Sequence, residues 1–358
     1  MSSHTTPHTS TADAVFRVGI VGASGYTGAE LMRLLAGHPH FELVVATGDS
    51  KAGERIADLY PHLAAVYGER TFDAFSPEIV DGLDVVFCGL PHGISQSVIP
   101  DIRGRVKHIV DLGSDFRLHD KGLYPTWYGA DHTCPELLDD FVYGLPELFR
   151  ENIAGAELIA ATGCNAATAV FALAPLLDAG LVEGSGIIVD LITGVSGAGR
   201  PPKPNTTFCT VDEDVTAYGL LTHRHTPEIE QALTEHTGVD TTVLFTPHLA
   251  PMNRGILATC YSRPTSSTTT SEALDAVASF YADEPFMVVS ERSPSTKATL
   301  GSNAVHLTAR VDPRTGLVIT IASLDNLMKG ASGMAIQNAN LAVGVPEVAG
   351  LSSIGVFP

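Results

Sequence analysis

A cysteine stands where an apolar run gives way to a segment of helical composition. The apolar stretch ELIAA ends at Ala161, Thr162 and Gly163 make a turn, and Cys164 follows at the start of the helical pattern. The partial positive charge at a helix N-terminus lowers the pKa of a thiol, and the thiolate is the reactive form. The position therefore predicts that Cys164 is a nucleophile, with Gly163 leaving room for a substrate.

A nucleophilic cysteine needs a general acid–base, and two histidines are candidates. His223 and His225 come just before a predicted helix, for which Thr226 is the expected N-cap and Pro227 the expected first residue. The pKa of an imidazole lies near the working pH. Ordinary surface histidines, or two ligands of a metal ion, fit the same pattern. No third ligand at metal spacing is evident, so we expect no metal site.

A loop of small residues is the third candidate. Ser196, Gly197, Ala198 and Gly199 follow an apolar strand, and the basic residues come next, at Arg200 and at position 203. Such a loop can lie close to a nicotinamide, and its cations suit a phosphate or carboxylate. An ordinary surface loop is the alternative.

The N-terminal region contains a glycine-rich pattern between two apolar strands. An apolar strand over 16–21 is followed by glycines at 22, 25 and 28, by a helical pattern over 29–36, and by a second strand, FELVVAT. This βαβ order, with glycine where backbone amides approach a pyrophosphate, predicts a dinucleotide-binding turn. A glycine-rich turn of another α/β protein is the alternative.

Two domains of different texture are expected in a chain of 358 residues. Further apolar strands follow over 83–90 and 106–112, and they end in polar loops. Beyond Cys164 the strands alternate, and the stronger helical patterns cover 167–178 and 227–236. We predict an α/β fold: a Rossmann-type domain over 16–161 plus 327–358, and an α+β catalytic and oligomerisation domain with a mostly antiparallel sheet over 162–326. The C-terminal segment 327–343 is expected to be helical and to pack on the first domain, and residues 1–15 to form a disordered tail.

Composition excludes several partners. The formal net charge is −19, from 40 acidic and 21 basic residues, and the acids are spread along the chain. This sign disfavours nucleic acid and anionic membrane, and the pattern is typical of a protein from a salt-rich cytoplasm. The five cysteines are scattered, which argues against disulfides and zinc. No signal peptide or apolar span is evident, so a cytoplasmic location is expected.

Several motifs together resemble a known family. They occur in the order found in the N-acetyl-γ-glutamyl-phosphate reductases, from about residue 16 to the C-terminus: GASGYTGAEL, LPHG, DLGSDFRL, YGLPEL, GCNAATA, SGAGR, HRHTPEIEQ and DNLMKGASGMAIQNAN. Where that family usually has GCYPTA, this chain has Asn165 and Ala166 in place of Tyr-Pro. The change is similar to the branch whose substrates are tethered to a carrier protein of the LysW type, although the extra alanine departs from that branch's GCNATA.

The resemblance implies a reaction. The Cys164 thiolate attacks an acyl phosphate, phosphate leaves, and NADPH reduces the resulting thioester to a semialdehyde in arginine or lysine biosynthesis. His225 is the implied acid–base and His223 a substrate ligand, or the reverse. The substrate is expected to be a γ-glutamyl or δ-aminoadipyl phosphate on a LysW-type carrier, with free N-acetyl-γ-glutamyl phosphate as the alternative. Further implied substrate contacts are Arg117, Asn165 and Arg200, and a dimer or tetramer is expected.

The implied cofactor contacts come from four segments. They are Gly22, Ser24, Gly25, Tyr26, Thr27, Gly48, Asp49, Ser50, Gly197 and Asn326. Relatives often have Ser-Arg after the second strand, whereas this chain has Gly48-Asp49. An acid there can bind a ribose hydroxyl, so NAD is the alternative to NADP, for which Lys51 or high salt would compensate. Two rival functions stay open: aspartate-semialdehyde dehydrogenase activity, and a non-catalytic dinucleotide sensor of the same fold.

Overall fold

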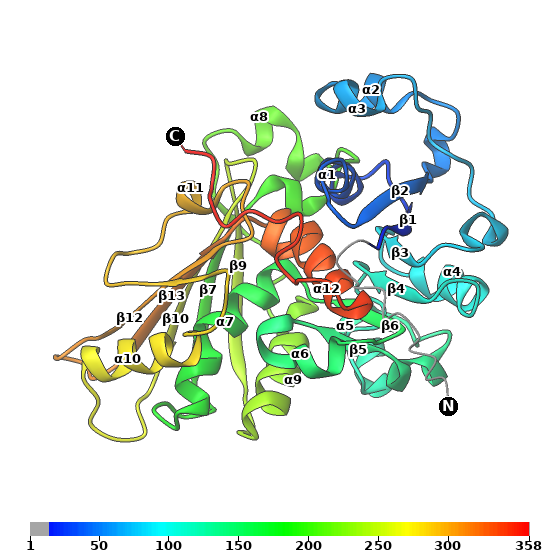
Figure 1. Cartoon of the computed structure of the whole chain (residues 1–358). Coiled ribbons are helices and arrows are strands. Elements are labelled where there is room, and N and C mark those ends of the chain that lie inside the picture. Colours follow the sequence, from blue (N-terminus) through cyan, green and yellow to red (C-terminus); the bar gives the residue numbers. More distant parts are fainter. Residues whose placement is uncertain (1–13, 358) are drawn as a thin grey trace, which may run out of the picture.

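The computed structural model describes residues 14–357. Positions 1–13 of the tail expected over 1–15 lie outside the described residues. Two sheets organise the chain, as Figure 1 shows. The first has six parallel strands in the order β2-β1-β3-β4-β6-β5. Their bounds are β1 Phe16–Val21, β2 Phe41–Ala46, β3 Val85–Cys88, β4 His108–Asp111, β5 Val142–Gly144 and β6 Leu158–Ala161.

Short apolar strands explain why this sheet is buried on both faces. Every residue of β3 and of β6 is buried, as expected for parallel strands covered by helices. The longer helices of this half are α1 Tyr26–Leu35, α4 Ser95–Ile102 and α6 Pro146–Ile153, and shorter ones are α2 Ile56–Leu59, α3 Ala64–Tyr67 and α5 Tyr124–Tyr128. The predicted Rossmann-type unit is confirmed.

The second sheet is mixed and has seven strands in the order β11-β12-β13-β10-β7-β9-β8. Four of its six pairings are antiparallel, as predicted, and β7–β9 and β11–β12 are parallel. The strands are β7 Ile187–Gly194, β8 Thr216–Ala217, β9 Val243–Ala250, β10 Ile256–Ser262, β11 Met287–Val289, β12 Val305–Val311 and β13 Val318–Leu324. The helices are α7 Cys164–Asp178, α8 Phe208–Val211, α9 His225–Thr237, α10 Thr270–Phe280 and α11 Thr296–Thr299.

Helix α7 connects the two halves. It begins directly after β6 of the first sheet and packs against β10 and β13 of the second. Its 13 buried residues follow from a sequence that is apolar on all sides. Cys164 therefore stands where the chain passes from one domain to the other.

The C-terminal segment is helical and packs on the first domain, as predicted for 327–343, but it is not one α-helix. A π-helix, η9 Met328–Ser332, precedes α12 Gly333–Val343. Residues 335, 336, 339 and 342 of α12 belong to the core around the first sheet, and Figure 1 shows α12 between the two sheets.

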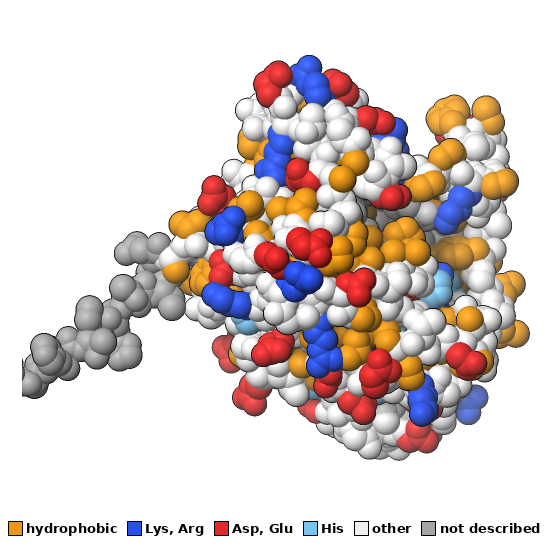
Figure 2. Space-filling model, turned by 90° about the vertical axis from the view of Figure 1, so that its right-hand side faces the viewer, with side chains coloured by type: hydrophobic (Ala, Val, Ile, Leu, Met, Phe, Trp, Pro, Cys, Tyr) orange, Lys and Arg blue, Asp and Glu red, His pale blue; other side chains and the backbone are white. Residues whose placement is uncertain are grey.

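The exposed charged side chains do not form one block on the face shown in Figure 2. Figure 2 shows acidic and basic groups interspersed over the face that it presents. No helix within residues 14–357 is long and apolar enough to cross a membrane.

Candidate active site

Cys164 is the first residue of α7, and Gly163 is the N-cap. A side chain at Gly163 would collide with His225 Nε2 and would lie 2.6 Å from Arg117 Nη1. Only glycine fits there, because the imidazole and the guanidinium both press on the backbone beside the nucleophile. The structure thus brings Cys164, His225 and Arg117, three residues expected at the site, around one peptide.

The pKa of the Cys164 thiol differs from the expectation. Burial raises it to about 11, although the nearby Arg117 charge and backbone hydrogen bonds act to lower it. The predicted lowering at the helix N-terminus is therefore wrong, because the cost of desolvating a thiolate exceeds the stabilisation by the Arg117 charge and the backbone hydrogen bonds. The thiol instead donates a 3.7 Å hydrogen bond to Asn165 Oδ1, and Asn165 Nδ2 donates to the Tyr218 hydroxyl at 3.2 Å.

The two histidines lie together. The His225 backbone amide donates to His223 Nδ1 at 3.1 Å, and the rings meet edge to face. Burial lowers the pKa of His223 to about 4, and burial together with the neighbouring His223 and Arg117 holds the pKa of His225 well below its usual value. The expected pKa near the working pH is therefore wrong for both histidines, because burial disfavours the charged form of each ring.

Helix α9 begins at His225, with Arg224 as its N-cap. The expected roles of Thr226 as N-cap and Pro227 as first residue are therefore wrong by two positions. Because the helix begins early, His225 is carried on the helix itself, and residues three positions apart share one face. That face places Glu228 beside His225.

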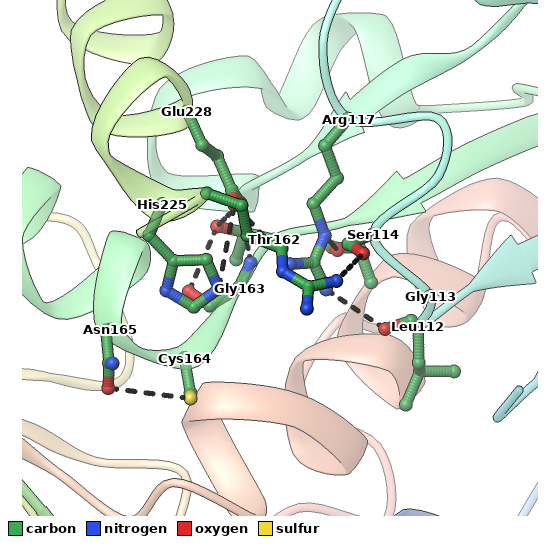
Figure 3. Close-up of polar contacts among 12 residues, drawn as sticks. Leu112, Gly113, Ser114, Arg117, Thr162, Gly163, Cys164, Asn165, His225 and Glu228 are labelled. Carbon is green, nitrogen blue, oxygen red and sulfur yellow. Dashed lines mark hydrogen bonds and ion pairs between the residues drawn. The ribbon is translucent and has the colours of Figure 1, made fainter. Parts of the chain in front are cut away.

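Glu228 is the centre of the site, and the sequence analysis missed it. This fully buried carboxylate accepts hydrogen bonds from the Gly163 amide at 2.7 Å and from the Tyr143 hydroxyl at 2.9 Å. It also lies 3.4 Å from Arg117 Nη1 and 3.9 Å from His225 Nε2. Figure 3 shows Glu228 and His225 descending from one helix while Arg117 reaches in from the opposite side. An acid three residues after a candidate catalytic histidine was the available signal.

Arg117 joins the carboxyl ends of two parallel strands. Its Nε donates to the Ala161 carbonyl at the end of β6 at 2.8 Å, and its Nη2 donates to the Leu112 carbonyl after β4 at 3.0 Å. This edge is where ligands bind in doubly wound sheets. A buried guanidinium paired with Glu228 can orient an anionic substrate beside Cys164.

The glycine-rich turn between β1 and α1 has the shape that a pyrophosphate needs. Gly22 has a φ of +91°, and a Cβ there would lie 2.5 Å from the Gly89 carbonyl oxygen. At Gly25, the N-cap of α1, a Cβ would meet nothing closer than the Gly22 oxygen at 3.7 Å. The open space in front of a helix N-terminus fits a dinucleotide phosphate. Tyr26 and Thr27 are the first two residues of α1, directly after this turn.

The other expected cofactor residues fall into two groups. Ser24 donates to the Gly48 carbonyl at 3.1 Å, which places the end of β2 beside the glycine turn. Asp49 and Ser50 are exposed on a short 3₁₀ turn there, and Lys51 pairs with Glu54 at 2.9 Å.

The second group lies in the catalytic domain. Asn326 Nδ2 donates to Ser196 Oγ at 2.9 Å, and a Cβ at Gly197 would lie 3.9 Å from the same amide nitrogen. Arg200 was expected at the substrate. The structure places it on the glycine turn instead, where its Nε donates to the Ser24 carbonyl at 2.8 Å. Among residues 14–357, no three or more histidine, cysteine or acidic side chains are grouped to hold a metal ion.

Comparisons with known proteins define the class first. Residues 17–156 match the family model described as semialdehyde dehydrogenase, NAD binding domain, and residues 164–326 match the semialdehyde dehydrogenase dimerisation domain. Solved aspartate-semialdehyde dehydrogenases share the fold. The enzyme II from Vibrio cholerae has a TM-score of 0.69 at 18% identity over 92% of this chain and 99% of that one. The Candida albicans enzyme, solved with NADP, has a TM-score of 0.66 at 17% identity over 93% and 100%.

Relatives of higher sequence identity define the family more narrowly. N-acetyl-γ-glutamyl-phosphate reductases of Symbiobacterium thermophilum and Desulforudis audaxviator are 49% and 47% identical to this chain over 346 residues, which is 96% of it and at least 99% of each relative. The chain therefore belongs to the N-acetyl-γ-glutamyl-phosphate reductase family. It is an oxidoreductase of the semialdehyde dehydrogenase type that acts on an acyl phosphate, and it has a nicotinamide-dinucleotide-binding domain.

Proposed function

We propose that this enzyme reduces free N-acetyl-γ-glutamyl phosphate to the semialdehyde with NADPH, in arginine biosynthesis. The observation that carries the proposal is the packing of His225 and Arg117 on the peptide that precedes Cys164. Relatives 42–49% identical to this chain are named N-acetyl-γ-glutamyl-phosphate reductases, which supports the N-acetyl substrate over the carrier-linked one that the Asn165 motif predicts. Aspartate-semialdehyde dehydrogenases share only the fold at 17–18% identity.

The chain's own residues account for acyl transfer. Arg117 holds the acyl phosphate beside Cys164, where Gly163 leaves space for it because it has no side chain. The sulfur attacks the acyl carbon while the carbon–oxygen bond to phosphate breaks. The thiol proton passes to His225, which is neutral and therefore able to accept it. Since the substrate brings negative charge, it favours an imidazolium at His225, which Glu228 then faces at 3.9 Å.

The bound dinucleotide supplies the hydride that reduces the thioester carbonyl. We assign its pyrophosphate to the open turn at Ser24 and Gly25 and its nicotinamide end to Gly197 and Asn326. His225 returns its proton to the carbonyl oxygen. When the thiohemiacetal collapses, its hydroxyl proton passes through His225 to the departing sulfur as the carbon–sulfur bond breaks. The NADP preference has a direct test. Turnover with NADH equal to that with NADPH would contradict it and would assign Asp49 to the ribose hydroxyls.

A carrier-linked substrate is the second candidate, because Asn165 touches the nucleophile where the family usually has tyrosine. The test is the reverse reaction with NADP⁺ and phosphate. It compares free N-acetylglutamate semialdehyde with glutamate semialdehyde on a LysW-type carrier. Efficient use of the free compound supports the main proposal, and strong preference for the carrier-linked aldehyde would overturn it. One methylene is worth only about 1–3 kcal/mol in a pocket, so an aminoadipate arm belongs in the same assay.

Four further expectations stay proposals. We assign 16–161 plus 327–358 to dinucleotide binding and 162–326 to catalysis and self-association, the latter supported by the dimerisation-domain match. Size-exclusion chromatography with light scattering tests the oligomer. We also propose a cytoplasmic location, and a salt-rich cytoplasm on the basis of the excess of acidic residues. A melting temperature that does not rise with KCl would contradict the salt adaptation.

A further inference from the structure

The π-helical turn Met328–Ser332, here the π turn, lies between the nucleophile and the dinucleotide loop. Two of its backbone hydrogen bonds span five residues: the Gly330 amide donates to the Asp325 carbonyl at 3.0 Å, and the Ser332 amide donates to the Leu327 carbonyl at 2.9 Å. Such turns are rare and are frequently found at functional sites. The extra residue in the turn widens the helix and moves its backbone outward.

On one side the π turn touches Cys164. A Cβ at Gly330 would lie 2.7 Å from Cys164 Cβ and 3.3 Å from its Cα. The φ of Gly330 is not in the left-handed region, so glycine is needed for space and not for backbone conformation. The π-turn backbone therefore packs directly against Cys164.

On the other side the π turn touches α1, the helix that directly follows the dinucleotide loop. Ser332 Oγ donates to the Thr27 carbonyl at 2.9 Å, and Arg33 donates to the Met328 sulfur at 3.2 Å. Thr27 lies in the segment that follows the open turn at Gly25. A single stretch of five residues thus joins the backbone of the nucleophile to the first turn of α1, directly after the cofactor loop.

A buried lysine anchors this stretch. Lys329 has no exposed surface. Its ammonium pairs with Glu147 of α6 and donates to Gln337 of α12 at 2.7 Å. It also lies 5.6 Å from the ring centre of Phe171 of α7 and 5.3 Å from that of Phe286. Burying a charge is costly unless it is paired, so these partners fix where the ammonium can sit. They come from both domains.

We propose that the π turn sets the separation between the Cys164 sulfur and the dinucleotide, with Gly330, Ser332 and Lys329 as positioning residues. The inference rests on the proposed function, because hydride transfer to a thioester needs the acyl carbon and the cofactor at a fixed distance. Gly330 sets the nucleophile side and Ser332 the cofactor side. Lys329 holds the turn against both domains.

The test compares Gly330→Ala and Ser332→Ala with Gly37→Ala, where a Cβ meets nothing within 4 Å. Two measurements are made on each variant. One is the rate at which iodoacetamide labels Cys164 without cofactor, and the other is steady-state turnover with ordinary and deuterated NADPH. A misplacement of about 1 Å can cost about a hundredfold in rate, so kcat of Gly330→Ala is expected to fall by about ten- to a hundredfold while KM for NADPH stays unchanged. Its labelling rate should also change, whereas Gly37→Ala should match the wild type in both.

Ser332→Ala is expected to give a different pattern from Gly330→Ala. It also keeps the proposal testable if Gly330→Ala does not fold. Labelling of Cys164 should match the wild type, while kcat falls and the deuterium isotope effect rises, because only the cofactor side has moved. Wild-type labelling and kcat in Gly330→Ala, or a wild-type isotope effect in Ser332→Ala, would overturn the inference. If the wild-type enzyme does not reduce N-acetyl-γ-glutamyl phosphate, the proposed function fails. The labelling comparison still decides whether Gly330 positions the sulfur.

Discussion

Replacing Glu228 with glutamine removes one charge from the centre of the site and keeps the shape of the side chain. Glutamine can still accept a hydrogen bond from the Gly163 amide through its carbonyl oxygen. Its NH₂ group must then face Arg117 Nη1, 3.4 Å away, where a carboxylate oxygen now lies. The substitution therefore leaves a buried guanidinium opposite another donor and without its counter-ion.

The loss of the Glu228 charge should lower the free energy of unfolding by several kcal/mol, on two grounds. Two unit charges 3.4 Å apart at an effective dielectric constant of about 20 attract by about 5 kcal/mol. Breaking a buried ion pair by removing one partner costs about 3–5 kcal/mol in other proteins. Glu228→Gln is thus expected to lower the free energy of unfolding by about 3–5 kcal/mol, measured by urea titration followed by circular dichroism.

Glu235→Gln is the matched control. Glu235 lies on the same helix, is 39% exposed, and faces His119 at 3.5 Å. Exposed pairs of this kind contribute less than about 1 kcal/mol. If Glu228→Gln unfolds at the same urea concentration as Glu235→Gln, Arg117 does not depend on Glu228, and the account of the buried network is refuted.

Three further predictions concern ionisation and catalysis. Because burial raises the pKa of the Cys164 thiol to about 11, its labelling by iodoacetamide should accelerate about tenfold per pH unit from pH 7 to 10, and a plateau reached by pH 8 would contradict this. His225→Asn should lower kcat by about a hundred- to ten-thousandfold with little change in the unfolding curve, and near wild-type turnover would remove His225 from proton transfer. Burial also raises the pKa of Asp111 from 3.8 to about 7. The folded protein holds this proton between these pH values while the unfolded chain releases it, so stability falls as pH rises through this range. Asp111→Asn should therefore reduce the drop in melting temperature between pH 5 and pH 8, and an equally steep drop would show that Asp111 is not its source.

Local signals in the sequence determined much of the architecture. The glycines at 22 and 25 and the apolar strands on either side of α1 predicted the βαβ unit, because positive φ, strand burial and helical periodicity are properties of neighbouring residues. The turn at 162–163 placed Cys164 at a helix N-terminus for the same reason. The Rossmann-type and mixed-sheet halves were predicted from the spacing of strands and helices.

Contacts between distant segments decided the chemistry of the site. Arg117 and Glu228 are 111 residues apart, and nothing in either local pattern indicates that they meet. The pKa values of Cys164 and His225 depend on how completely other segments exclude water, so rules drawn from the helix end and from free imidazole predicted the wrong direction. The sequence by itself determined which elements form and which residue stands at the exit of β6. Only the tertiary structure decided what surrounds that residue, because desolvation and ion pairing depend on packing between segments far apart in the chain.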